Sequence, residues 1–171
     1  MKCFTNTPLA LMLCALLFSG CASFEMTHYS GDFVRPLDVK ALDAVSYRHT
    51  MISGMVYRNS SQELVMKDLS QKVLMQELNA RGYEPVSGGA DFYAVSKWRK
   101  EINPSAAEAV RFSLIVELYE SATDKVFWRA ELPYIFNAMQ WSEERVSQTL
   151  RMAIEDFPSR LESAPNPPSV Q

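Results

Sequence analysis

Two neighbouring stretches alternate apolar and polar residues, and this pattern constrains the fold more than any other feature of the sequence. In residues 109–120 the apolar side chains fall at every second position, at Val110, Phe112, Leu114, Val116 and Leu118. Residues 124–135 repeat the alternation with Val126, Trp128, Ala130, Leu132 and Tyr134. Successive side chains of a strand point to opposite faces, so each stretch predicts a half-buried strand.

The short connection between these stretches predicts an antiparallel hairpin. Pairing Glu120 with Asp124 over residues 121–123 gives the register Leu118–Val126 and Val116–Trp128, and it places both apolar sets on one face. The opposite face then brings one acidic side chain near two basic ones, Glu117 with Lys125 and Arg129. This arrangement favours a surface ladder of charges over a catalytic role for Glu117.

Two segments have the period of amphipathic helices. Ser60 and Glu63 have the spacing of a capping box, and a helix is expected over residues 61–81. A second helix is expected to begin at Ser142, a residue that caps helix N-termini, and to end before Pro158.

Shorter patterns complete the predicted domain. Strands are expected at 90–99, at 43–49 and 51–57 with an interruption near Gly54, and at 22–28, with a connection at 29–42. The elements together predict an α+β class: a two-layer domain with a four- to five-stranded, mostly antiparallel sheet and two helices on one face.

The N-terminus has the organisation of an export signal. Lys2 provides a positive charge, residues 8–18 form an uncharged apolar run, and small residues precede Cys21. The segment Phe18-Ser19-Gly20-Cys21 resembles the lipobox of bacterial lipoproteins. Residues 1–20 are therefore expected to be removed, and Cys21 is expected to carry the lipid.

Cysteine usage agrees with lipidation. Of the three cysteines, Cys3 and Cys14 leave with the signal, so an exported protein would contain neither a disulfide nor a free thiol. Ala22 stands where aspartate favours retention in the inner membrane of enterobacteria. An outer-membrane location facing the periplasm, with the membrane contacted through the lipid on Cys21, is therefore expected.

The mature chain has the length of one domain. A single domain is expected over residues 21–158, followed by a proline-rich, disordered tail at 159–171. Without Lys2 the mature chain has 16 basic and 20 acidic residues, and it contains no basic block. Nucleic-acid binding is therefore not expected.

Several short motifs occur in the order found in a known family. The start Cys21-Ala-Ser-Phe-Glu-Met-Thr-His with Gly31-Asp32-Phe33 is followed by Leu78-Asn-Ala-Arg-Gly82-Tyr83, the pair Ala90-Asp91, Val126-Phe-Trp128-Arg129 and Phe157-Pro158. In this order they resemble the bacterial lipoproteins known as domain of unknown function 4136. The hairpin departs from the family pattern because it lacks the usual glycine. The resemblance implies an envelope lipoprotein and supplies no established activity.

Catalytic and metal-binding patterns are weak. His28 and His49 are the only histidines and are not spaced as metal ligands, and Gly88-Gly89 lacks the serine arrangement of a nucleophile elbow. Glu143 and Glu144 are explained by their position in the first turn of a helix. Neither an enzyme nor a cofactor is expected.

Two non-catalytic hypotheses remain. The protein binds an envelope partner or supports an envelope assembly, or it binds a small apolar ligand or lipid. The sheet face without helices is expected to offer the contact surface, with aromatic and apolar residues among charges: Tyr93, Val95, Ile115, Tyr119 and Phe127. An alternative is that a connection, such as residues 29–42, folds over them.

Overall fold

The computed structural model describes residues 31–54, 60–103 and 110–161. The elements in chain order are β1 (Gly31–Phe33), η1 (Val39–Ala41), β2 (Ala44–Gly54), α2 (Ser60–Ala80), β3 (Glu84–Pro85), β4 (Phe92–Ile102), β5 (Val110–Glu120), β6 (Lys125–Asn137), η2 (Ala138–Gln140) and α3 (Glu143–Ile154). The signal segment, Cys21 and the strand expected at 22–28 lie outside the described residues.

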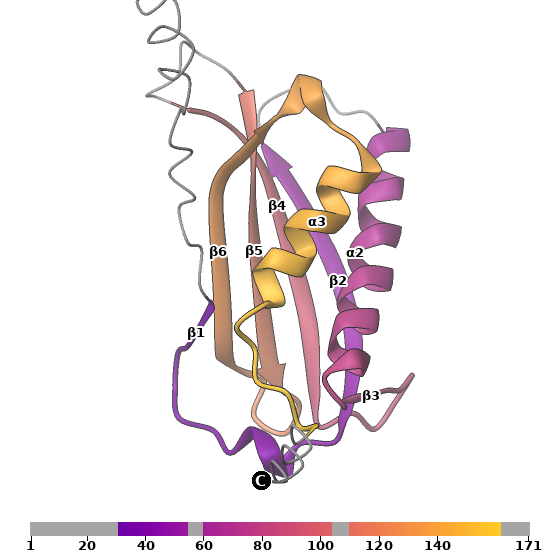
Figure 1. The fold of residues 1–171 in the computed structure, drawn as a ribbon, viewed down its shortest axis with the longest axis vertical. Helices are drawn as coiled ribbons and strands as arrows, with labels where there is room; N and C mark the ends of the chain where they lie inside the picture. Colours follow the sequence, from indigo (N-terminus) through magenta and orange to yellow (C-terminus); the bar gives the residue numbers. More distant parts are fainter. Residues whose placement is uncertain (1–30, 55–59, 104–109, 162–171) are drawn as a thin grey trace, which may run out of the picture.

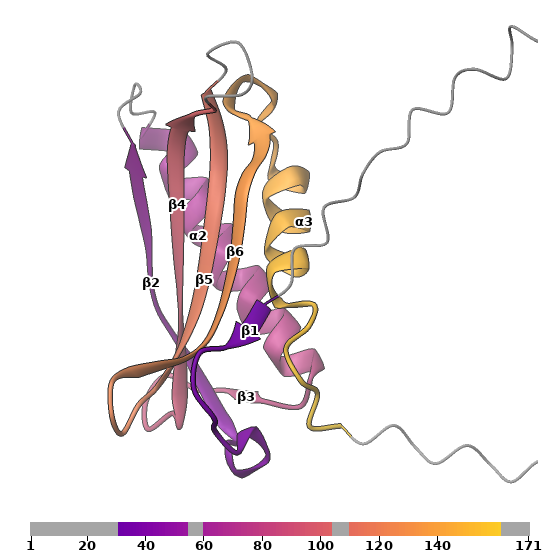
Figure 2. The same cartoon turned by 90° about the vertical axis from the view of Figure 1, so that its left-hand side faces the viewer.

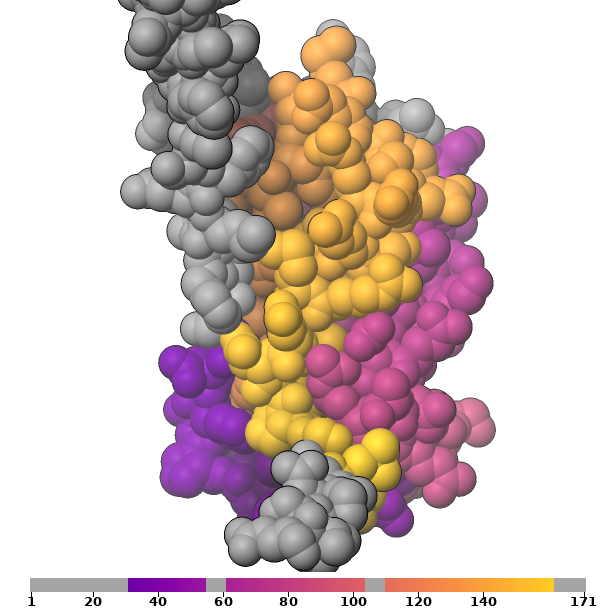
Figure 3. Space-filling model, in the orientation of Figure 1, coloured from indigo at the N-terminus to yellow at the C-terminus, as the bar shows by residue number. Residues whose placement is uncertain are grey.

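The strands form one sheet in the order β1-β6-β5-β4-β2-β3. Neighbouring strands are antiparallel except that β2 runs parallel to both β4 and β3. Both helices lie on the same face of the sheet (Figures 1 and 2), and α3 packs closely against α2 on that side (Figure 3). The predicted α+β class is confirmed. The sheet has six strands where four to five were predicted. The short strands β1 and β3 were missed because they lie in segments without a strand pattern.

The parallel pairing of β2 with β4 depends on α2. Parallel neighbours require a crossover connection, usually a helix, and α2 provides it between these strands. The strands expected at 43–49 and 51–57 form one strand as far as Gly54, where β2 ends, and the remainder of the second lies outside the described residues. The irregularity of β2 lies earlier, where the register shifts between Tyr47 and His49 so that Arg48 is inserted.

The β5–β6 hairpin has a different register from the predicted one. Glu120 pairs with Lys125 and not with Asp124, which adopts a left-handed conformation at φ 56°. A register shift then makes Leu118 pair with Trp128. The shift leaves Phe127 as an extra residue between two paired positions, and this reverses its face.

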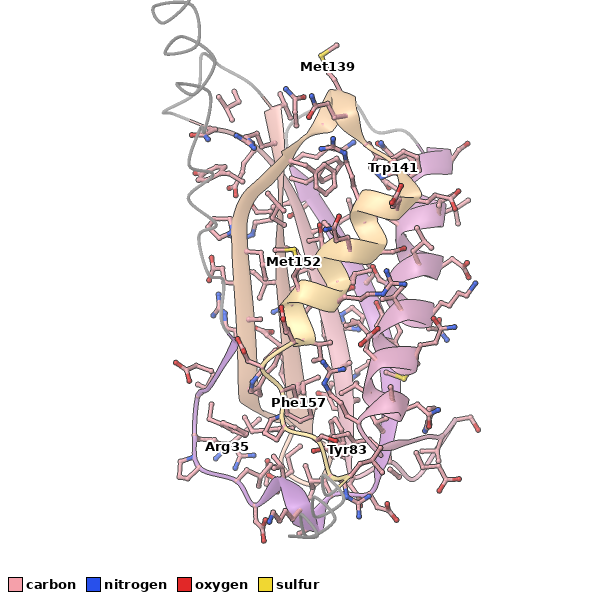
Figure 4. The ribbon with its side chains drawn as sticks, in the orientation of Figure 1. Arg35, Tyr83, Met139, Trp141, Met152 and Phe157 are labelled. Carbon is pink, nitrogen blue, oxygen red and sulfur yellow. The ribbon has the colours of Figure 1, made fainter. Side chains whose placement is uncertain are left out.

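The core between the sheet and the helices is rich in aromatic rings. Phe157, just after α3, lies with its ring centroid 5.4 Å from those of Tyr83 and Trp128, and further rings of Phe92 and Phe127 surround it. Figure 4 shows Phe157 and Tyr83 at the lower end of α3. Trp98, fully buried, donates its indole N–H to Ser70 of α2 at 3.0 Å. This indole therefore has a hydrogen-bond partner inside the core.

The chain remains packed against the domain a short way beyond Pro158. The amide of Arg160 donates to the carbonyl of Arg81 at 2.8 Å, and its guanidinium pairs with Asp43. These contacts join the segment after α3 to the start of β2 and to the end of α2, where Gly82 has a positive φ of 91°.

Candidate functional site

The sheet face opposite the helices, called the open face below, contains most of the predicted contact residues. Antiparallel pairing of β4 with β5 places Tyr93 opposite Tyr119, and Val95 opposite Glu117. The side chains of Tyr93, Val95 and Ile115 are only 8%, 3% and 3% exposed, and Tyr119 is half-buried. Their role as contact residues stays a prediction, but only Tyr119 offers substantial surface.

Phe127 does not belong to the open face, and this prediction is wrong. Its side chain is fully buried, and its ring centroid lies 5.7 Å from that of Phe92 in the core. The physical reason is the register shift between Leu118 and Tyr119, which turns Phe127 towards the helices together with Trp128. Val126, the partner of Tyr119, lies on the other side.

Glu117 is the centre of a polar cluster on the open face. Its carboxylate accepts hydrogen bonds from Lys97 at 2.5 Å and from the hydroxyl of Tyr119 at 2.6 Å, and Arg129 lies 3.8 Å away. Burial alone would raise the pKa of Glu117, but these hydrogen bonds and positive charges hold it below its ordinary value. Glu117 is therefore an ionised structural group and not a proton donor near neutral pH.

A second polar group adjoins this cluster. The rings of Tyr93 and Tyr119 stack with centroids 5.0 Å apart, and the guanidinium of Arg48 lies 4.7 Å above Tyr93. Arg48 also pairs with Asp124 at 2.9 Å, and the Tyr93 hydroxyl donates to the same carboxylate. Burial, the hydrogen bond to Glu117 and nearby negative charge raise the pKa of Tyr119 to about 12. Both tyrosines are thus neutral hydrogen-bond donors.

Two hollows lie on either side of β2 at Ser46 and Tyr47. One, about 510 Å³, contains the polar group and is lined by Ser46, Tyr47, Arg48, Ser87, Tyr93, Ser121 and Asp124. The other, about 430 Å³, faces α2 and is lined by Ser46, Tyr47, Gln71, Met75, Pro85, Val86 and Ser87. The first is mainly polar, while the second has an apolar floor formed with Met75 and Val86.

The edge of the sheet at β2 is open between these hollows. β3 pairs with β2 only at Ala44 and Val45, where the amide of Val86 donates to the Val45 carbonyl at 2.8 Å. Within the described part of the chain, no strand pairs with the outer side of residues 46–54. This range contains neither proline nor lysine, which commonly protect edge strands, and its protective feature of that kind is the bulge at Arg48 near its start.

The opposite edge, at β6, is protected. β1 covers Trp128, Arg129 and Ala130. Pro133 follows, and Tyr134 has a positive φ of 50° while its amide donates inward to the Ser113 hydroxyl at 2.8 Å. A regular strand cannot continue along such an edge. The two edges therefore differ in their capacity to accept another strand.

Sequence reasoning missed the β2 edge. The sign in the sequence was the absence of proline and lysine from residues 46–54, but recognising an edge also requires the strand order. His49 lies exposed on β2, and His28 is outside the described residues. Among residues 31–54, 60–103 and 110–161, no group of three or more His, Cys, Asp or Glu side chains could hold a metal ion.

Several residues of the sequence motifs described above have structural roles. Asp91 accepts hydrogen bonds from the amides of Ala44 and Asp43 at 2.9 and 2.8 Å, which lower its pKa and fix the start of β2 beside β4. Gly31 lies under the Trp128 ring, where a β-carbon would approach to 1.9 Å. Tyr83 donates to the Pro158 carbonyl at 3.1 Å. These residues therefore hold the fold together.

Neither protein-family models nor curated proteins match the sequence. The fold resembles those of several solved structures. A dodecamer of a PelC variant from Paraburkholderia phytofirmans matches with a TM-score of 0.47 and 9% identity, covering 73% of this chain and 93% of that chain. A DUF4136 family protein from Bacteroides thetaiotaomicron matches with a TM-score of 0.45 and 11% identity, covering 73% and 90%.

A PDZ domain protein from Parabacteroides distasonis matches with a TM-score of 0.53 and 11% identity, covering 77% of this chain and 35% of that protein. At this level of identity the likeness shows a shared fold. None of the helices within the described ranges is long and apolar enough to span a membrane.

Proposed function

We propose that this protein is a non-catalytic lipoprotein, held at the periplasmic side of the outer membrane by a lipid on Cys21, that binds an envelope protein through the free edge of β2. The observation that carries the proposal is the open edge at residues 46–54 in a sheet whose other edge is protected. The ordered family motifs support membership of domain of unknown function 4136 as part of the same proposal.

A free edge recognises an extended peptide through main-chain hydrogen bonds, while side-chain pockets supply specificity. β3 already uses the beginning of this edge, since Val86 bonds to Val45 before the chain leaves at Gly88-Gly89. A partner strand would continue from that level along β2. Its backbone would satisfy the outward-facing groups of residues 46–54.

The two hollows match the alternation of such a strand. Successive side chains point to opposite sides, so one would enter the hollow beside Met75 and the next the hollow beside Arg48. The partner segment therefore needs an apolar residue next to a polar one that can bond to Arg48 or to the serine hydroxyls. This requirement describes the kind of segment that would be selected.

Partner binding is tested with a lysine placed on the edge. His49 is exposed on β2 and pairs with the uncharged Val95, so His49→Lys should leave the melt unchanged while reducing the yield of crosslinked partners from intact cells. Leu64→Lys is the matched control, since Leu64 is 67% exposed on α2. Equal yields from both variants would show that partners bind elsewhere.

Lipidation is tested by intact mass. The protein extracted from membranes should be cleaved before Cys21 and carry acyl groups, because the apolar run ends at Ser19-Gly20-Cys21. Cys21→Ser should release it into the soluble fraction. An unmodified N-terminus on the membrane-extracted protein contradicts this part of the proposal.

Binding of a small apolar ligand is the second candidate, and one observation favours it. A hollow of about 510 Å³ at the lower end of the domain is lined by Phe33, Pro36, Leu37 and Asp38. Native mass spectrometry of protein purified from membranes should then show a bound lipid, and Leu37→Glu should remove it. Ligand-free wild-type protein would eliminate this candidate.

A further inference from the structure

The end of the domain where β4 and β6 finish, called the η2 end below, presents exposed apolar side chains. Met139 is 94% exposed, the highest value among the large apolar residues that the structure describes, and Ile102 is 57% exposed. Figure 4 shows Met139 projecting away from the fold, with Trp141 at the same end. Trp141 is half-buried and packs against the core.

The turn that carries Met139 is firmly built. The side-chain oxygen of Asn137 accepts a hydrogen bond from the Met139 amide at 2.8 Å, and no residue of η2 is buried. Asn137 itself ends β6, which is paired with β5 through Arg111. The exposure of Met139 is therefore imposed by a capped turn at the end of a paired strand.

The direction of β1 places the anchor on the side of this end. β1 is antiparallel to β6, with Gly31 opposite Ala130, so the chain reaches Gly31 from the side on which β6 ends. Cys21 precedes Gly31 by ten residues, a reach of up to about 33–36 Å. The path from Ala130 to Asn137 along β6 is about 23 Å. The lipid can thus lie level with η2 without a reversal of the chain.

Charge distinguishes the two ends. The η2 end carries both signs, with Arg99 and Arg145 exposed as well as Glu143 and Glu144. At the opposite end, exposed carboxylates outnumber the exposed basic side chains of Lys40, Arg48 and Lys125. These carboxylates belong to Asp38, Asp43, Glu84, Asp91 and Asp124. Anionic phospholipids repel an acidic end and attract exposed arginines, so the η2 end is the one that they favour.

We infer that the η2 end faces the lipid surface and that Met139 enters its headgroup region. The inference rests on the proposed anchor at Cys21. β2, β4 and β6 all finish at the η2 end (Figure 1). In this orientation the strands therefore lie outside the membrane and point towards its surface. The open edge of β2 then extends away from the membrane and is accessible from the side.

The test uses the full-length lipoprotein in vesicles of phosphatidylethanolamine and phosphatidylglycerol. Once Cys3 and Cys14 have left with the signal and Cys21 is acylated, an introduced cysteine is the only free thiol. Met139→Cys and Ala122→Cys are labelled with an environment-sensitive fluorophore; Ala122 is exposed at the tip of the β5–β6 hairpin, at the opposite end. The label at 139 should shift to the blue and brighten about twofold, as expected on entering an apolar interface, while the label at 122 should not change.

The outcomes separate this inference from the proposed function. Acylated protein that floats with the vesicles but gives equal responses, or a larger one at residue 122, overturns the inference and leaves the anchor intact. Protein without acyl groups that stays off the vesicles overturns both. A headgroup-labelled quencher lipid should also quench the label at 139 selectively, and quenching confined to residue 122 would reverse the orientation.

Discussion

The centre of the open face is nearly as buried as the helix-covered face, but by different means. On the helix-covered face, aromatic rings such as those of Trp98, Trp128 and Phe157 fill the space below α2 and α3. On the open face, Val95 and Glu117 are 3% and 6% exposed without a helix above them. The comparison teaches that low exposure on a sheet can come from hydrogen-bonded charges and stacked tyrosines as well as from apolar packing.

The largest expected effect distinguishes the two faces at neighbouring positions. Phe127→Ala should destabilise the domain by about 3–5 kcal/mol because it removes a fully buried ring. Val126→Ala, on the open side of the same strand, should cost about 1 kcal/mol. Denaturant melts of soluble residues 22–171 measure both. A larger loss of stability for Val126→Ala than for Phe127→Ala would mean that Val126, and not Phe127, lies in the core.

An intermediate effect is expected at Glu117. Glu117→Gln should cost about 1–3 kcal/mol at neutral pH because it leaves Lys97 without its carboxylate partner. The pKa of Glu117 is lowered on folding, so its stabilising contribution is present above the ordinary glutamate pKa of about 4.3. This contribution is lost as pH falls through the lower pKa of the folded state.

The difference in stability between wild type and Glu117→Gln should therefore shrink as the pH is lowered below about 4. Melts over a pH series measure it. Glu131→Gln serves as a control, since Glu131 is exposed and pairs at the surface with Arg129. A difference that grows in acid would mean that the open-face cluster does not favour the ionised carboxylate.

The smallest effect is expected at the rim of the same cluster. Arg129 has a side chain 42% exposed and lies 3.8 Å from Glu117, so Arg129→Ala should cost less than about 1 kcal/mol. The same melts test it. A loss as large as that of Glu117→Gln would show that Arg129, and not Lys97, holds the carboxylate.

Much of the fold was predictable from local periodicity, and the rest depended on long-range pairing. The strand over 109–120 and the helix over 61–81 are confirmed to within a residue, because each has a long regular pattern. The register shift beside Tyr119 was not predictable, since Phe127 and Trp128 are both apolar and alternation alone cannot choose between them. The parallel pairing of β2 with β4 was not predictable either, because it depends on the position to which α2 carries the chain between these two strands.

The candidate site was predictable only in part. Tyr93 and Tyr119 were predicted to share the open face, and their pairing agrees with this placement. Their burial was not predictable, because it arises from Lys97, Glu117 and Arg48, whose side chains meet only in the folded sheet. The open edge of β2 follows from strand order, which no local pattern encodes.

The crossover that places β2 beside β4 also bears on how the chain folds. The β5–β6 hairpin joins residues close in sequence, whereas Val45 and Phe92 must meet across the whole of α2. Contacts with long loops form slowly because loop closure costs entropy before any pairing is gained. We expect β2 to pair last, after the hairpin and β4 have formed, so a newly folding chain passes through a stage in which β4 is itself an uncovered edge.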